Sequence, residues 1–137
     1  MAVGNTNLPE ENLQSMIFTM RGVQVMIDRD LASIYQVESK RLNEQVKRNI
    51  VRFPEAFRFQ LNDVEKEELV ANCDRFKSLK HSTVNPYAFI EQGVAMLFAI
   101  LRSETAIRSS IHIMDVAFFN YRRRVLAQLL LRPDETG

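Results

Sequence analysis

The segment DLASIYQVESKRLNEQVKRNIVRFP, from Asp30 to Pro54, constrains the fold more than any other part of the sequence. Its apolar residues recur at helical spacing in two blocks, which are Leu31, Ile34 and Tyr35 and then Leu42, Val46 and Ile50. Pro54 ends the second block, because proline lacks an amide hydrogen and disfavours helix in the residue before it. The spacing predicts two helices joined by a short turn within residues 30–51, with Asp30 and Ser39 as N-caps.

Two small or apolar residues favour close packing of these predicted helices. A helix-turn-helix unit needs a small residue where its helices approach each other and an apolar residue in the turn. Ala32 and Val37 stand at those positions. The segment therefore predicts a helix-turn-helix-like unit in which Leu42 and Val46 hold the second helix against the first.

Positive charge is concentrated on the second predicted helix. Residues 40–52 carry a net charge of +4 while the whole chain carries +1, so the remaining residues sum to −3. With the apolar stripe against the core, the predicted DNA contacts are Lys40, Arg41, Asn43, Lys47, Arg48 and Arg52. Arginine fits guanine, asparagine fits adenine and lysine neutralises phosphate, so these residue types suit double-stranded DNA. The alternative is a solvated helix face on which Glu44 pairs with its basic neighbours.

The residues around this segment predict a small antiparallel sheet. Two runs of β-branched and large apolar residues, 16–20 and 23–27, flank Arg21-Gly22 and predict a hairpin. Residues 57–61 alternate in polarity and predict a strand that joins the hairpin. The predicted fold class is α+β, a small sheet packed on a helical core that holds the helix-turn-helix-like unit, with a long C-terminal helix.

The second half of the chain is predicted to be mostly helical. Asn62 or Asp63 is the expected N-cap of a short acidic helix, and residues 73–86 are expected to form a surface loop. Residues 88–101 predict a buried helix, in which Gly93 marks a close helix contact. The segment PYAFIEQG at 86–93 has two interpretations, a polar site built on Tyr87, Glu91 and Gln92 or the start of that core helix, and the second is favoured.

Chain length and composition predict one domain with appendages. The expected organisation is a flexible leader over residues 1–14, a DNA-binding domain over 15–103, a C-terminal helix over 104–131 and a tail over 132–137. The only cysteine is Cys73, which favours a reducing compartment. The N-terminus does not resemble a signal peptide, and the apolar run at 94–101 is too short to cross a bilayer. We therefore expect a cytoplasmic protein without a membrane partner.

The last predicted helix has heptad spacing, carried by Ile107, Ile111, Met114, Phe118, Tyr121 and Val125. Its first half is expected to pack inside the domain, whereas little is left to cover its second half. An exposed apolar stripe of that size favours self-association. The sequence therefore predicts a homodimer through Phe118, Tyr121, Val125 and Leu129, which would present two DNA-reading helices to a palindromic site.

Catalytic and metal-binding patterns are missing from the sequence. Cys73, His81 and His112 are the only thiol and imidazoles, and no two of them show metal-ligand spacing. The chain has four glycines and no glycine-rich phosphate loop. We therefore expect no enzyme activity, no catalytic residues, no metal and no cofactor.

Four short motifs together resemble a known family. They are DLA-x-x-Y at 30–35, KRLNEQVKRN at 40–49, RFPEAFRFQL at 52–61 and PYAF-x-EQG at 86–93. With them, the region from about Gly22 to Met114 resembles the open-reading-frame-six N-terminal domain of phages and prophages, which is related to the KilA-N domains. The resemblance implies a DNA-binding domain of an antirepressor-like or other phage regulatory protein.

The resemblance also implies which residues form the family's basic helix, namely Lys40, Arg41, Asn43, Gln45, Lys47, Arg48 and Asn49. Two residues depart from the family pattern, since Gln36 replaces the usual glycine of the turn and Ile90 replaces a threonine. The alternative function is a protein-interaction module that binds a repressor or another protein. DNA binding predicts a steep loss of affinity with salt, whereas a protein partner held by the apolar last helix would tolerate moderate salt.

Overall fold

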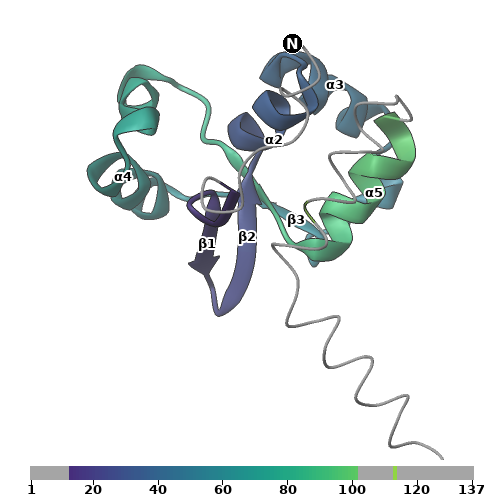
Figure 1. The fold of residues 1–137 in the computed structure, drawn as a ribbon, viewed down its shortest axis with the longest axis horizontal. Coiled ribbons are helices and arrows are strands. Elements are labelled where there is room, and N and C mark those ends of the chain that lie inside the picture. The colour runs from purple at the N-terminus through teal and green to yellow at the C-terminus, as the bar shows by residue number, and fades with distance from the viewer. Residues whose placement is uncertain (1–12, 102–112, 114–137) are drawn as a thin grey trace, which may run out of the picture.

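The computed structural model describes residues 13–101 and residue 113, and it confirms the α+β class (Figure 1). A four-stranded antiparallel sheet lies at its centre. The elements in chain order are β1 (Ile17–Met20), β2 (Val23–Ile27), α2 (Asp28–Tyr35), α3 (Ser39–Arg48), the 3-10 helix η2 (Ile50–Arg52), β3 (Arg58–Gln60), α4 (Asp63–Asn72), the 3-10 helix η3 (Asp74–His81), β4 (Tyr87–Phe89) and α5 (Glu91–Leu101).

The hairpin forms where the sequence predicts it. β1 and β2 pair antiparallel from Ile17 opposite Met26 to Met20 opposite Val23. The two turn residues both have positive φ, 53° at Arg21 and 79° at Gly22. Two such residues make the tight turn whose twist matches that of the flanking strands. Glycine adopts this conformation without steric cost, which is why the turn is readable from the sequence.

The third predicted strand does not join the hairpin directly. The strand order is β1-β2-β4-β3, so β4 lies between β2 and β3. Ala88 of β4 pairs with Ile27 on one side and with Phe59 on the other. The prediction of a helix from residue 88 is therefore wrong for residues 88 and 89, and α5 begins at Glu91. A short apolar run that is buried on both faces has the same pattern in a strand as in a helix.

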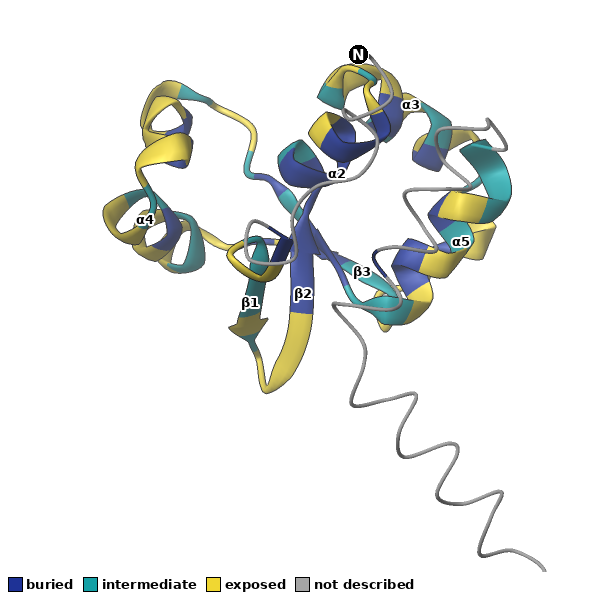
Figure 2. Cartoon of the chain, in the orientation of Figure 1, coloured by how far each residue is buried: buried dark blue, intermediate teal, exposed yellow. Residues whose placement is uncertain are grey.

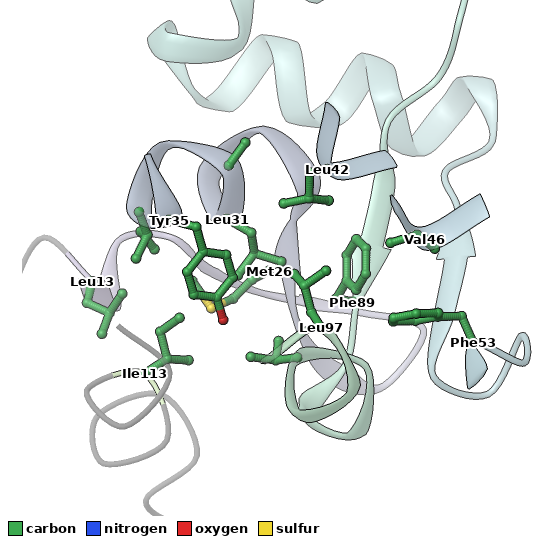
Figure 3. Packing of buried hydrophobic residues seen from close by; sticks show 13 residues of the cluster. Leu13, Met26, Leu31, Tyr35, Leu42, Val46, Phe53, Phe89, Leu97 and Ile113 are labelled. Atoms are coloured by element: carbon green, nitrogen blue, oxygen red, sulfur yellow. The ribbon is translucent and has the colours of Figure 1, made fainter. Parts of the chain in front are cut away.

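The sheet separates two hydrophobic cores. Side chains alternate between the two faces of a strand, so Met26 lies in one core while Val25 and Ile27 lie in the other. The first core joins the sheet to α2, α3 and α5 (Figure 3). The second joins it to α4 and η3. In Figure 1, α4 accordingly lies on the side of the sheet away from α3 and α5.

The first core includes two residues from outside the strands and helices just described. Leu13, which belongs to the predicted leader of residues 1–14, is fully buried in it. Ile113, from the predicted last helix, is helical and fully buried in the same cluster. Both lie near Tyr35 in Figure 3.

The predicted surface loop at 73–86 is wrong over its first part, because η3 occupies Asp74–His81. Phe76 and Leu79 are buried, and the Phe76 ring lies 6.1 Å from that of Phe18. Their three-residue spacing suits a 3-10 helix, which has three residues per turn. Charged neighbours conceal this short apolar pattern in the sequence.

The start of the acidic helix is confirmed. The Asn62 side chain accepts a hydrogen bond from the Glu65 amide at 2.8 Å, and the Glu65 carboxylate accepts one from the Asn62 amide at 2.8 Å. This reciprocal arrangement is a capping box. Among the helices described, none is long and apolar enough to cross a membrane.

Candidate nucleic-acid interface

The connection between α2 and α3 is a tight turn of Gln36, Val37 and Glu38. Gln36 is in the left-handed region, with φ 61° and ψ 43°. The Val37 amide donates to the Ala32 carbonyl at 2.9 Å, which closes the end of α2. The position therefore requires the backbone conformation that glycine adopts most easily. The turn keeps this geometry although glutamine replaces the glycine.

One face of α3 is buried and the other is exposed. Leu42 and Val46 are fully buried in the first core. The exposed residues of the helix are Lys40, Arg41, Glu44, Lys47 and Arg48. Figure 2 shows this alternation of buried and exposed residues along α3. The predicted orientation is confirmed for Leu42 and Val46, which lie inward, and for the basic residues, which lie outward. Ile50, the last residue of the predicted apolar stripe, is instead exposed in η2, because the helix has already ended.

Both predicted N-caps are wrong. The residue before α2 is Ile27 and the residue before α3 is Glu38, and neither makes a side-chain cap hydrogen bond. Asp30 lies instead within α2, where it is buried and ion-paired with Arg75. Sequence reasoning missed this pair, since Arg75 stands in the segment predicted to be a surface loop.

The helix ends earlier than the pattern predicts, and a 3-10 turn follows it. Asn49 leaves the helical region at φ −122° and ψ 34°, and its side chain donates to the Gln45 carbonyl at 2.8 Å. Arg52 is exposed at the end of η2. Phe53 then enters the core, where its ring meets Phe89 edge-on with centroids 6.0 Å apart.

Four arginines of the described region are held by other residues. Arg21 pairs with Glu65 at 2.9 Å, and its guanidinium lies 3.9 Å from the Phe59 ring centre. Arg29 donates to Ser78 Oγ at 2.8 Å. Arg58 stacks on the Tyr87 ring at 3.9 Å. Arg75 donates to both Asp30 carboxylate oxygens, at 3.0 and 2.9 Å.

The basic residues of α3 and η2 differ from these four. No side chain among Lys40, Arg41, Lys47, Arg48 and Arg52 makes a hydrogen bond or an ion pair with another of the described residues. Glu44, the one acid among them, lies in no ion pair with Lys40, Lys47 or Arg48 within the same region. The segment therefore presents five cations that no other described residue neutralises.

Two open depressions flank α3. One has a volume of about 350 Å³ and is lined by Glu38, Lys40, Arg41, Glu44, Gln45 and Arg48. The other, of about 380 Å³, lies between the α2–α3 turn and the end of α5 and shares Glu38, Arg41 and Gln45 with the first. Both are open hollows beside the basic residues rather than enclosed cavities for a small molecule.

Asn43 occupies a different place from the other predicted contacts. It is half-buried, and its amide nitrogen donates to Asp28 Oδ2 at 2.9 Å. The same carboxylate accepts from the Arg29 amide at 2.7 Å and the Tyr87 amide at 3.3 Å. Burial raises the pKa of Asp28, although these hydrogen bonds oppose the shift. Asn43 thus ties α3 to Asp28 at the start of α2, and Asp28 in turn bonds to β4.

The PYAFIEQG segment joins β4 to α5 in a tight crossing. The Ile90 amide donates to the Phe57 carbonyl at 3.0 Å, and the Ile90 carbonyl accepts from the Val94 amide at 3.0 Å. A Cβ atom added to Gly93 would lie 2.3 Å from the Phe57 carbonyl oxygen. Gly93 therefore marks a close approach, as predicted, but to the backbone before β3 rather than to a helix.

The structure does not test the predicted dimer site, and the described residues form no metal site. The dimer residues Phe118, Tyr121, Val125 and Leu129 lie outside the described residues, so the homodimer stays a prediction. Cys73 is half-buried and His81 is exposed at the end of η3. Within residues 13–101 and 113, no three histidine, cysteine or acidic side chains are grouped so that they could hold a metal ion.

Comparison with known proteins places the chain in a family. No curated protein and no solved structure matches it. The model of the ORF6N domain matches residues 15–100, a region that runs from the start of the hairpin to the end of α5 and makes up more than half of the chain. The chain therefore belongs to the ORF6N family of phage-type domains.

Proposed function

We propose that this domain binds double-stranded DNA in phage-type gene regulation, with α3 and η2 as the contact surface. The observation that carries the proposal is a set of five cations on one short segment that have no partner among residues 13–101 and 113, while four arginines elsewhere in that region are held by protein groups. Unneutralised lysine and arginine side chains on a convex helix attract a polyanion and release its counterions.

The proposed contacts divide into two kinds. Lys40, Lys47 and Arg52 neutralise phosphates, since an ammonium or exposed guanidinium binds phosphate oxygens without regard to sequence. Arg41 and Arg48 have planar guanidinium groups that fit the two acceptors of guanine in the major groove. Asn43 serves as a positioning residue in this proposal, because its amide already donates to Asp28.

The test is fluorescence anisotropy of a labelled duplex titrated at several salt concentrations. The wild-type chain is compared with Lys47→Glu/Arg48→Glu, which reverses two exposed charges on α3. We expect binding that weakens steeply with salt and a loss of at least about a hundredfold in the variant, since two attractive contacts become repulsive. The orientation of α3 is unaffected, because both substituted side chains are exposed and unpartnered among the described residues.

The matched control is Lys77→Glu/Lys80→Glu. It makes the same change in net charge at two exposed lysines of η3, on the other side of the sheet. We expect its DNA affinity to fall only severalfold, by the change in net charge alone. Equal losses in both variants would contradict a contact on α3. No binding of the duplex even at low salt would contradict the proposed function and favour the protein-interaction alternative.

A further inference from the structure

The turn after α3 exposes two adjacent apolar side chains. Val51 is 91% exposed and Ile50 is 49% exposed. The other exposed large apolar residues of the described region are Val23, Val64, Val84 and Phe98, and no two of them adjoin in the sequence. Single apolar residues on a surface are ordinary, but Val51 is the most exposed of the set and has an apolar neighbour.

The turn that carries Val51 is held firmly at both ends. The Arg52 amide donates to the Asn49 carbonyl and the Phe53 amide to the Ile50 carbonyl, both at 2.9 Å. Phe53 is 4% exposed and anchors the turn in the first core. Valine is also stiff about its first side-chain torsion. Val51 is therefore presented in one direction, and ordering it against a ligand loses little entropy.

Charge distinguishes this apolar pair from the others. Val51 lies next to Arg52 and three residues after Arg48, and both arginines are unpartnered within the described region. Val64, which is 63% exposed, stands instead between Asp63 and Glu65 at the start of α4. A ligand of the Val51 surface must combine negative charge with apolar groups close to it. Duplex DNA has this combination, because the thymine methyl is an apolar group between two phosphate backbones.

We propose that Val51, beside Ile50, contacts a thymine methyl in the major groove and gives the domain a preference for an A·T pair at that position. The inference rests on the proposed function, since the neighbouring arginines must first hold the duplex. The charged groups of arginine and lysine do not recognise the thymine methyl group, because that group is apolar. An apolar side chain in η2, just after α3, adds that discrimination.

The experiment compares an A·T-rich duplex with the same duplex in which uracil replaces every thymine. Uracil pairs like thymine and lacks only the methyl group. We expect the wild-type chain to bind the thymine duplex about fourfold more tightly, the effect of burying roughly one methyl group. In Val51→Ser the ratio should fall to about one, with affinity for the uracil duplex unchanged. Val64→Ser, the matched control on α4, should keep the wild-type ratio.

Other outcomes overturn the inference in distinguishable ways. A wild-type ratio of one, or a Val51→Ser variant whose affinities for both duplexes equal those of the wild type, excludes contact of Val51 with the methyl group and favours a protein ligand for the apolar pair. Equal weakening on both duplexes assigns Val51 to the sugar–phosphate backbone instead. If the wild-type chain binds neither duplex at low salt, the proposed function fails and the inference fails with it. Val51→Ser leaves folding intact because the side chain is almost fully exposed.

Discussion

Arginine has two roles among the residues described in this protein. Arg21, Arg58 and Arg75 lie over aromatic rings, and Arg21 and Arg75 also pair with carboxylates. Arg41 and Arg48 have neither kind of partner within that region. The residue type alone does not separate the two roles, because partners such as Glu65 and Asp30 lie about 44 positions away in sequence.

Asn43 shows how a side chain on a basic helix differs from its neighbours. The helical pattern places it on the outer face with Lys40 and Lys47. In the folded chain its amide nitrogen donates to the buried Asp28, and its carbonyl oxygen is buried without a hydrogen-bond partner among the described residues. A residue at the border of the apolar stripe can point toward the solvent or toward the protein interior. The hydrogen bond to Asp28 holds the Asn43 side chain toward the interior.

Replacing Gln36 by glycine is predicted to stabilise the domain. Glutamine at φ 61° has a strain of about 1 kcal/mol that glycine avoids. The greater freedom of glycine in the unfolded chain offsets part of this gain, so we expect the free energy of unfolding to rise by about 0.5 kcal/mol. Urea denaturation measures the change. Gln45→Gly, the same substitution inside α3, should instead lower it by about 1 kcal/mol. A loss of similar size in both variants would show that the turn does not favour glycine.

At the scale of elements, the amphipathic pattern predicts α3 correctly because one face of the helix is buried and the other is solvated. β4 has no such contrast, since Ala88 and Phe89 are buried on opposite faces of the sheet. Only its pairing with Ile27 and Phe59 makes this segment a strand. A strand in the middle of a sheet is therefore the element that local sequence identifies least well here.

Gly93→Ala is predicted to destabilise the joint between β4 and α5. The new methyl group would lie 2.3 Å from the Phe57 carbonyl oxygen, and this backbone atom is fixed by its hydrogen bond from Ile90. We expect the free energy of unfolding to fall by about 2 kcal/mol, although alanine favours helix. Thermal unfolding measures the loss, with Gln92→Ala on the exposed side as a control that leaves stability nearly unchanged. A neutral Gly93→Ala would show that α5 can move away from Phe57.

At the scale of the whole molecule, the sheet keeps two surfaces of different charge apart. The basic helix α3 packs on the first core, whereas the acidic helix α4 packs on the second. One ion pair connects the two layers, since Arg75 of η3 reaches the buried Asp30 of α2 and also donates to the Ser15 carbonyl at 3.2 Å. This arrangement holds the acidic helix on the side of the sheet opposite to the proposed DNA surface.

Arg75→Ala is predicted to weaken the fold in a pH-dependent way. Burial raises the pKa of Asp30, and the hydrogen bond from Arg75 opposes that rise. Loss of the arginine leaves a buried carboxylate unpaired, so we expect the free energy of unfolding to fall by about 2 kcal/mol at neutral pH. This expected loss of free energy is smaller than the loss for a fully buried ion pair, because the Arg75 side chain is 37% exposed.

The sign of the pH effect follows from the direction of the pKa shift. A carboxyl whose pKa is raised in the folded state stabilises the fold below its unfolded value of 3.8, and this contribution is lost as pH rises through the folded pKa. Without Arg75 the pKa of Asp30 rises further, so the loss should shrink as pH falls toward 4. Urea denaturation at both pH values tests this, with Lys77→Ala, which breaks an exposed pair with Asp74, as the control. An equal loss of unfolding free energy at both pH values would show that the charge of Asp30 does not contribute to the effect of Arg75→Ala.

The sequence by itself determined the local features of this protein. The turn at Gly22, the N-cap of the acidic helix at Asn62 and the inward stripe of Leu42 and Val46 follow from nearby residues and backbone chemistry. Family membership also followed from short motifs whose spacing is visible in the sequence.

Only the tertiary structure decided which distant groups meet. It placed β4 between β2 and β3, joined Asp30 to Arg75 and turned Asn43 toward Asp28. It also left the cations of α3 and η2 without partners among the described residues. The physical reason is that periodicity and capping depend on residues within a few positions of each other. Strand order, ion pairing and burial of a polar side chain depend on where the rest of the chain packs.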